Sequence, residues 1–85
     1  MKPVTVYTRA FCPYCRRALA LLERKGAQVQ EIDATACPDK RQEMIQRSGR
    51  WTFPQIFIGD THVGGCDDLH ALEQRGALDP LLTGA

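Results

Sequence analysis

Hydrophobic and polar positions follow two different periods along the first third of the chain. Residues 2–7 alternate β-branched and aromatic side chains with polar ones, which predicts a strand that leads into a loop. Apolar residues then recur at helical spacing over residues 13–25, and Gly26 is a suitable helix stop. Residues 28–33 predict a second strand. Because strand, helix and strand follow one another as in a βαβ unit, we expect the two strands to be parallel.

The remaining pattern predicts a helix, a hairpin and a last helix. Residues 38–47 begin with proline and precede a Ser-Gly stop, although few apolar positions mark the buried face of this helix. Two short alternating runs around a Gly-Asp turn, residues 54–58 and 61–63, predict a β-hairpin that ends at a Gly-Gly pair. Residues 67–74 are helical, with acidic side chains in the first turn. We expect residues 80–85 to form a short packing turn and a frayed end.

The predicted order of elements is therefore βαβαββα, a member of the α/β class. One mixed four-stranded sheet flanked by three helices accounts for the whole pattern. A chain of 85 residues buries too little surface for two separate cores, so we expect one domain over residues 1–85.

Composition and charge exclude several classes of protein. Hydrophobic residues make up 44% of the chain and charged residues 25%, as in folded globular proteins and unlike disordered or collagen-like chains. The formal net charge is only +1, so no basic field favours nucleic acid or anionic lipid. The sequence therefore predicts no nucleic-acid partner and no membrane partner.

The four cysteines bear on the cellular compartment. The first residues contain no apolar run with a small-residue cleavage site, and no stretch reaches a membrane-spanning length. We therefore expect a cytoplasmic protein, where reducing conditions disfavour structural disulfides. In that setting, two cysteines separated by two residues indicate redox chemistry.

Cys12 and Cys15 are the candidate catalytic residues. A cysteine attacks a disulfide only as its thiolate, and an unperturbed thiol with a pKa of about 8.5 is mostly protonated at neutral pH. Cys12 falls at the predicted helix start, where free N–H groups and the helix dipole favour the anion. Cys15 lies in the first helical turn, within disulfide reach of Cys12 but further from solvent. We therefore predict that Cys12 is the attacking nucleophile and Cys15 the resolving thiol, with Arg9, Arg16 and Arg17 adding positive charge around them.

A zinc site is the alternative for a Cys-x-x-Cys pair, and it needs two further ligands at suitable spacing. Cys37 and Cys66 are isolated in the sequence, and His62 and His70 have no spacing that completes such a site. We therefore predict no metal site. The two histidines are expected to face solvent or to pack, Cys37 to be an ordinary residue near a helix start, and Cys66 to matter through its backbone.

Three segments of the chain together resemble the glutaredoxin family, in its bacterial glutaredoxin 3 type. They are Cys12-Pro13-Tyr14-Cys15, then Thr52-Phe53-Pro54, then Gly64-Gly65-Cys66-Asp67-Asp68, in the order and at the spacing of that family. The resemblance extends over nearly the whole chain. It implies a thioredoxin fold in which Pro54 follows a cis peptide bond and faces the two cysteines.

The resemblance also implies a glutathione site. Its residues are expected to be Arg9, Tyr14, Thr52, Phe53, Pro54, Gly65, Cys66 and Asp67. In the family, the backbone before the cis proline pairs with the cysteine part of glutathione, and the basic residue before the motif meets the glycine carboxylate. The γ-glutamyl carboxylate is received at the turn and helix start after the glycine pair. A helix N-terminus after two glycines is independently a good anion site.

The activity implied by the resemblance is glutathione-dependent reduction of protein–glutathione mixed disulfides and protein disulfides. Glutathione is then a co-substrate, with no tightly bound cofactor, and the protein acts as a monomer. The protein partners carry glutathionylated or disulfide-bonded cysteines, and whether ribonucleotide reductase is among them stays open. The alternative is a carrier that holds an iron–sulfur cluster through Cys12 and glutathione. The Pro-Tyr pair and the second cysteine of the motif favour the oxidoreductase over this carrier.

Two aromatic residues depart from the family pattern. Phe53 stands where relatives usually have valine, and Trp51 precedes that segment. A backbone contact survives the change to phenylalanine, whereas the added rings can alter which protein partners fit. For Trp51 we expect a partly buried packing residue, with a place in the groove as the alternative.

Overall fold

The computed structural model describes residues 1–84, and their order of elements agrees with the pattern of the sequence up to the C-terminal segment. The elements are β1 (Val4–Thr8), α1 (Pro13–Arg24), β2 (Val29–Asp33), α2 (Pro38–Ser48), β3 (Gln55–Ile58), β4 (Thr61–Gly64), α3 (Cys66–Gln74) and α4 (Leu78–Thr83). The predicted strands and the three predicted helices are confirmed, with boundaries that differ by two residues or fewer.

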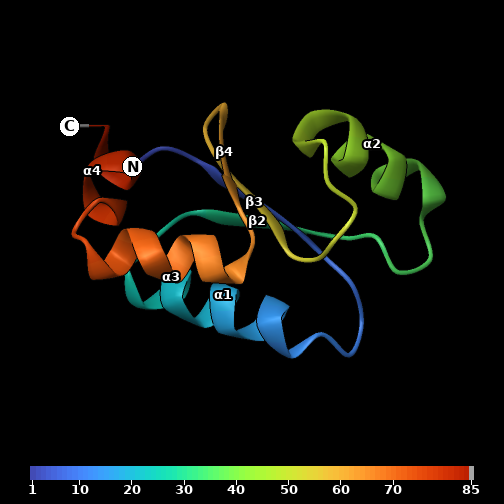
Figure 1. Cartoon of the computed structure of the whole chain (residues 1–85), viewed down its shortest axis with the longest axis horizontal. Coiled ribbons are helices and arrows are strands. Elements are labelled where there is room, and N and C mark those ends of the chain that lie inside the picture. The colour runs from blue at the N-terminus through green and yellow to red at the C-terminus, as the bar shows by residue number, and fades with distance from the viewer. Residues whose placement is uncertain (85) are drawn as a thin grey trace.

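The four strands form one mixed sheet in the order β2-β1-β3-β4 (Figure 1). β1 and β2 are parallel, as the βαβ connection predicts, and Val4 lies opposite Val29. β3 is antiparallel to both β1 and β4. The pairing of β3 with β4 contains an irregularity between Ile56 and Phe57. This is the mixed α/β sheet expected from the sequence.

The larger core lies on the sheet face that α1 and α3 cover. Side chains alternate between the two faces of a strand, so Val4 and Val6 of β1 share this face with Ile56 and Ile58 of β3. Apolar residues of α1, α3 and α4 pack onto them, and Leu22 of α1 is fully buried. Figure 1 shows α1 and α3 side by side along this face.

The opposite face of the sheet has a smaller core beneath α2. Tyr7 of β1 and Phe57 of β3 point to this side and meet edge to face, with ring centroids 6.0 Å apart. Met44 is the buried residue of α2, which agrees with the few apolar positions of this helix in the sequence. Tyr7 also donates a hydrogen bond to Glu43 and accepts one from Arg47 (2.8 Å). Polar contacts therefore attach α2 to the sheet in addition to apolar ones.

The C-terminal segment differs from expectation. We expected a packing turn and a frayed end over residues 80–85, but residues 78–83 form the short helix α4, in which Leu78 and Leu82 are buried. Proline is tolerated there because Pro80 lies in the first turn, where backbone N–H groups have no partner within the helix. Lys2 donates a backbone hydrogen bond to Leu82 (2.7 Å), so α4 is tied to the start of the chain. Ala85 lies outside the described residues.

No helix within residues 1–84 has the length and apolar character needed to cross a membrane.

Candidate active site

Cys12 occupies the position that begins α1. It is the N-cap residue, with an extended backbone, and Pro13 takes the first helical position, where its missing N–H costs nothing. The sulfur of Cys12 accepts a hydrogen bond from the backbone N–H of Cys15 (3.2 Å). The sulfur of Cys12 therefore lies at the positive end of the helix with a backbone donor directed at it. The sequence predicted this position correctly.

Cys15 lies one turn further into α1, under Cys12. It is 2% exposed, against 5% for Cys12, so both sulfurs are largely buried. Burial raises the pKa of Cys15 to about 12, and the hydrogen bond with Cys12 and the charge of Cys12 add to the rise. The two thiols therefore have different surroundings: a backbone N–H points at the sulfur of Cys12, whereas the buried Cys15 stays protonated at neutral pH.

The segment before Cys12 presents an aromatic ring to solvent. Phe11 has a positive φ of 57°, and its side chain is 99% exposed. A non-glycine residue in this region is uncommon, and such residues concentrate at functional sites. A cleft of about 590 Å³ beside the cysteines is lined by Cys12, Cys15, two basic residues and two acidic ones, which are Arg9, Arg16, Glu31 and Asp33. The arginines expected from the sequence lie near the pair, but the two carboxylates balance their charge in this cleft.

A second cleft, of about 160 Å³, brings together most of the residues that the sequence assigned to glutathione. Its lining consists of Tyr14, Arg50, Thr52, Phe53, Pro54, Gly65, Cys66, Asp67 and Asp68. Seven of these nine were predicted, from three segments that are far apart in the chain. Arg50 was missed, and Asp68 was regarded chiefly as a helix-start residue.

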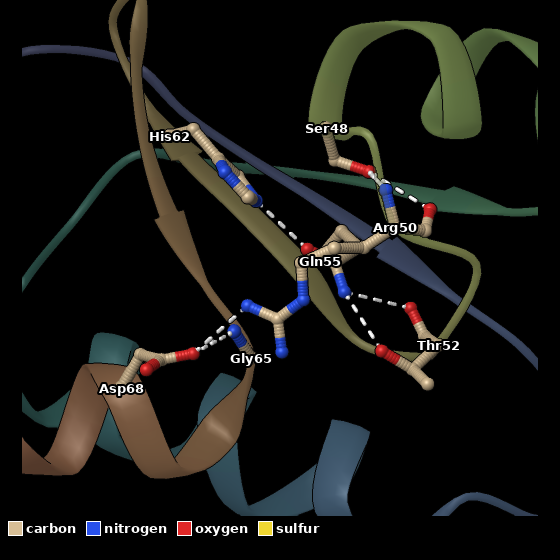
Figure 2. A network of polar contacts seen from close by, with 7 residues as sticks. All are labelled: Ser48, Arg50, Thr52, Gln55, His62, Gly65 and Asp68. Carbon is tan, nitrogen blue, oxygen red and sulfur yellow. Dashed lines mark hydrogen bonds and ion pairs between the residues drawn. The ribbon is translucent and has the colours of Figure 1, made fainter.

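The wall of this cleft formed by α3 depends on a close approach at its start. Asp68 accepts a hydrogen bond from the N–H of Gly65 (2.9 Å) and forms an ion pair with Arg50 (3.2 Å), as Figure 2 shows. The hydrogen bond from Gly65 lowers the pKa of Asp68 below its usual range, and the Arg50 guanidinium lowers it further. Gly64 has a φ of +114°, and a Cβ there would lie 2.3 Å from the Asp68 carboxylate. Only glycine therefore fits this turn.

The opposite wall is the segment that leads into β3. The Phe53–Pro54 peptide bond is cis, as the resemblance implied. Directly after it, the fully buried side chain of Gln55 bonds to Thr52 and to His62 (Figure 2). Neither Gln55 nor His62 was identified from the sequence, because their contact depends on how β3 and β4 pair.

Arg9 and the two unusual aromatic residues border a neighbouring cleft of about 390 Å³. It is lined by Arg9, Arg41, Trp51, Thr52 and Phe53. The Arg41 guanidinium lies 5.9 Å from the centre of the Phe53 ring. Trp51 is 69% exposed, so the expectation of a partly buried packing residue is wrong and the alternative, a place at the groove, agrees with the structure.

The other two cysteines lie at the starts of α2 and α3. Cys37 is the N-cap of α2, as its sequence position suggested. Cys66 contacts His70 one turn along α3, with 3.4 Å between the sulfur and Nδ1, and burial raises the pKa of Cys66. Within residues 1–84, no group of three or more His, Cys, Asp or Glu side chains is placed to hold a metal ion.

Comparison with known proteins supports the resemblance noted from the sequence. A family model described as glutaredoxin matches residues 4–63. Glutaredoxin 3 of Escherichia coli K12 is 58% identical over 82 residues, which cover 96% of this chain and 99% of that protein. A solution structure of a glutaredoxin from Brucella melitensis is 65% identical with a TM-score of 0.84, and covers 100% of this chain and 94% of its own. A crystal structure of a buckwheat glutaredoxin–glutathione complex is 34% identical with a TM-score of 0.88, and covers 98% of this chain and 78% of its own.

Proposed function

This chain belongs to the glutaredoxin family of glutathione-dependent disulfide oxidoreductases, and from that premise we propose that Cys12 is its nucleophile and Cys15 its resolving thiol. The substrates proposed are protein–glutathione mixed disulfides and protein disulfides. The observation that carries the assignment is the difference between the two sulfurs. Cys12 is the helix N-cap with a backbone donor on its sulfur, whereas Cys15 is buried beneath it with a raised pKa.

The first proposed reaction needs only Cys12. Its thiolate attacks the glutathione sulfur of a mixed disulfide, a bond forms between Cys12 and glutathione, and the substrate leaves as a thiolate that takes a proton from solvent. A second glutathione thiolate then attacks that glutathione sulfur. Oxidised glutathione leaves, and Cys12 returns as a thiolate.

The second proposed reaction, on protein disulfides, needs both cysteines. Cys12 attacks one sulfur of the substrate to form a mixed disulfide, and Cys15 then attacks Cys12, which releases the reduced substrate. Two contributions that raise the pKa of Cys15 come from Cys12, its hydrogen bond and its charge. Both disappear once Cys12 is bound in a mixed disulfide, so Cys15 is easier to deprotonate at the step that uses it. Glutathione finally reduces the bridge between the two cysteines.

We propose that glutathione lies in the cleft between the cis-proline segment and the start of α3. The backbone of Phe53 pairs with the cysteine part of glutathione, and the start of α3, at Gly65, Cys66 and Asp67, receives the γ-glutamyl carboxylate. Arg9 meets the glycine carboxylate, and Tyr14 flanks the sulfur. Support comes from the shared cleft, from Arg9 in the cleft that adjoins it through Thr52 and Phe53, and from the glutathione complex of the buckwheat relative.

The test is reduction of a glutathionylated peptide, coupled to NADPH through glutathione reductase. Cys12→Ser should abolish the activity, because serine cannot form the thiolate, whereas Cys15→Ser should retain it and lose only the reduction of protein disulfides. Cys37→Ser is the matched control, since Cys37 starts α2 and should leave both activities unchanged.

Equal loss of both activities in Cys15→Ser would contradict the assigned roles. An inactive wild type would contradict the function itself. Brown colour and visible absorbance after anaerobic purification, together with that inactivity, would then favour the cluster carrier.

A further inference from the structure

Gln55 is a buried polar side chain at the point where the cis-proline segment enters the sheet. It is 0% exposed. Its nitrogen donates to the carbonyl oxygen of Thr52 (2.9 Å) and to the Thr52 hydroxyl (3.1 Å). Its oxygen lies 2.8 Å from Nε2 of His62 on the next strand (Figure 2). A buried amide is costly unless its atoms are hydrogen-bonded, and here both ends are used.

The direction of these bonds fixes the proton on His62. A carbonyl oxygen only accepts hydrogen bonds, so the nitrogen of Gln55 faces Thr52 and its oxygen faces His62. Nε2 of His62 is therefore the donor. Burial, and then the nearby charge of Arg50, lower the pKa of His62, so the neutral ring protonated at Nε2 is the form present at neutral pH. The His62 ring also packs on Phe57, with centroids 5.0 Å apart.

This chain of contacts ends on the peptide group that precedes Phe53. The carbonyl of Thr52 and the N–H of Phe53 belong to one planar peptide, and in a trans peptide they point in opposite directions. The cis bond is the next one along, between Phe53 and Pro54. Because Gln55 holds the carbonyl toward the sheet, the N–H of Phe53 is turned away from the sheet. Phe53 itself lines the cleft.

We propose that Gln55 and His62 are positioning residues that set the orientation of the Phe53 N–H for glutathione. The inference rests on the proposed function, in which the Phe53 backbone pairs with the cysteine part of glutathione. Neither side chain lines the cleft that holds Phe53, so both act through Thr52. They therefore affect the binding of glutathione substrates and do not affect the reactivity of the Cys12 sulfur.

The experiment compares two near-isosteric variants. Gln55→Glu keeps an acceptor for His62, and its ionised carboxylate, the form studied at a pH well above its pKa, cannot donate to the Thr52 carbonyl. His62→Phe keeps a ring on Phe57 and removes the donor. For each, KM and kcat for a glutathionylated peptide are measured, together with the rate at which iodoacetamide alkylates Cys12. Thr61→Ala, at an exposed neighbour on β4, is the matched control.

The expected result is a rise in KM with little change in Cys12 alkylation. KM should rise about tenfold in Gln55→Glu and about threefold in His62→Phe, the range that corresponds to one lost hydrogen bond. His62→Gln, which can again donate to Gln55, should bring KM back toward the wild-type value.

Unchanged KM in His62→Phe would overturn the inference, and this variant decides the matter where Gln55→Glu does not fold. A parallel loss of thermal stability and Cys12 alkylation, with KM unchanged, would also overturn it, because the residues would then be structural. A wild type without activity on the glutathionylated peptide would instead contradict the proposed function, and the inference would fall with it.

Discussion

Cys12 and Cys15 belong to the same helical turn, yet their surroundings assign them different chemistry. The N–H of Cys15 points at the sulfur of Cys12, so the first sulfur has a backbone hydrogen-bond donor. The second sulfur has lost nearly all contact with water, and the first one adds to its raised pKa. The roles proposed for the two residues, nucleophile and resolving thiol, therefore rest on their different depths in the helix.

Limited alkylation should show this difference directly. With a pKa of about 12, only about one part in ten thousand of Cys15 is thiolate at pH 8. Substoichiometric iodoacetamide should therefore label Cys12 almost alone at that pH, and label on Cys15 should rise only as the pH approaches 12. Fragmentation of the tryptic peptide of residues 10–16, which contains both cysteines, reads the two sites separately.

The protein unfolded in urea is the control, because both cysteines should then react alike. Equal labelling of the two residues in the native protein at pH 8 would show that burial does not separate them.

The helix α2 is attached to the sheet in a different way from α1 and α3. Its buried apolar contribution is Met44, and the phenol of Tyr7 supplies much of the remaining attachment through Glu43 and Arg47. The Arg47 guanidinium also lies 4.1 Å from the centre of the Phe57 ring. A single hydroxyl in the sheet thus connects two charged residues of α2.

Tyr7→Phe should therefore lower the free energy of unfolding by about 2 kcal/mol, since the hydroxyl makes two hydrogen bonds with charged partners. Urea denaturation followed by circular dichroism measures the change. Tyr14→Phe removes a hydroxyl from a ring that is 53% exposed, and should change stability by less than about 0.5 kcal/mol. Equal effects of the two substitutions would argue against this role for Tyr7.

At the scale of the whole molecule, residues 1–84 contain two cores of unequal size on the two faces of one sheet. Eleven buried residues make up the core beneath α1 and α3, and three make up the core beneath α2. Regions with few buried apolar contacts open at a lower free energy than the rest of a protein. The side of the sheet that holds α2 is therefore the part of the fold expected to open first.

Hydrogen exchange under native conditions tests this order. Amides of α2 should exchange through openings that cost at least about 2 kcal/mol less than those of β1 and β3, which lie in the middle of the sheet. Exchange rates measured by NMR for individual amides provide the comparison. Protection of α2 as strong as that of β1 would mean that the two cores unfold as one unit.

Much of this arrangement could be predicted from the sequence, and the failures have physical causes. The start of α1 was predictable because a cap residue, proline and helical spacing coincide at Cys12. The short helix α4 was not, because Pro80 suggested a turn although the first helical turn tolerates proline. The contact of Arg50 with Asp68 joins segments that meet only in the fold. The contact of Gln55 with His62 lies within a predicted hairpin, but it depends on a register irregularity that no local pattern marks.

The glycine turn before α3 also limits which substitutions this sequence can accept. Gly64 is constrained twice, by its φ of +114° and by the 2.3 Å that would separate a Cβ from the Asp68 carboxylate. Gly26 also has a positive φ, of +72°, but a Cβ there meets nothing within 4 Å, so asparagine or aspartate can replace it. In a library of random variants selected for activity, Gly26 should therefore vary while Gly64 stays fixed.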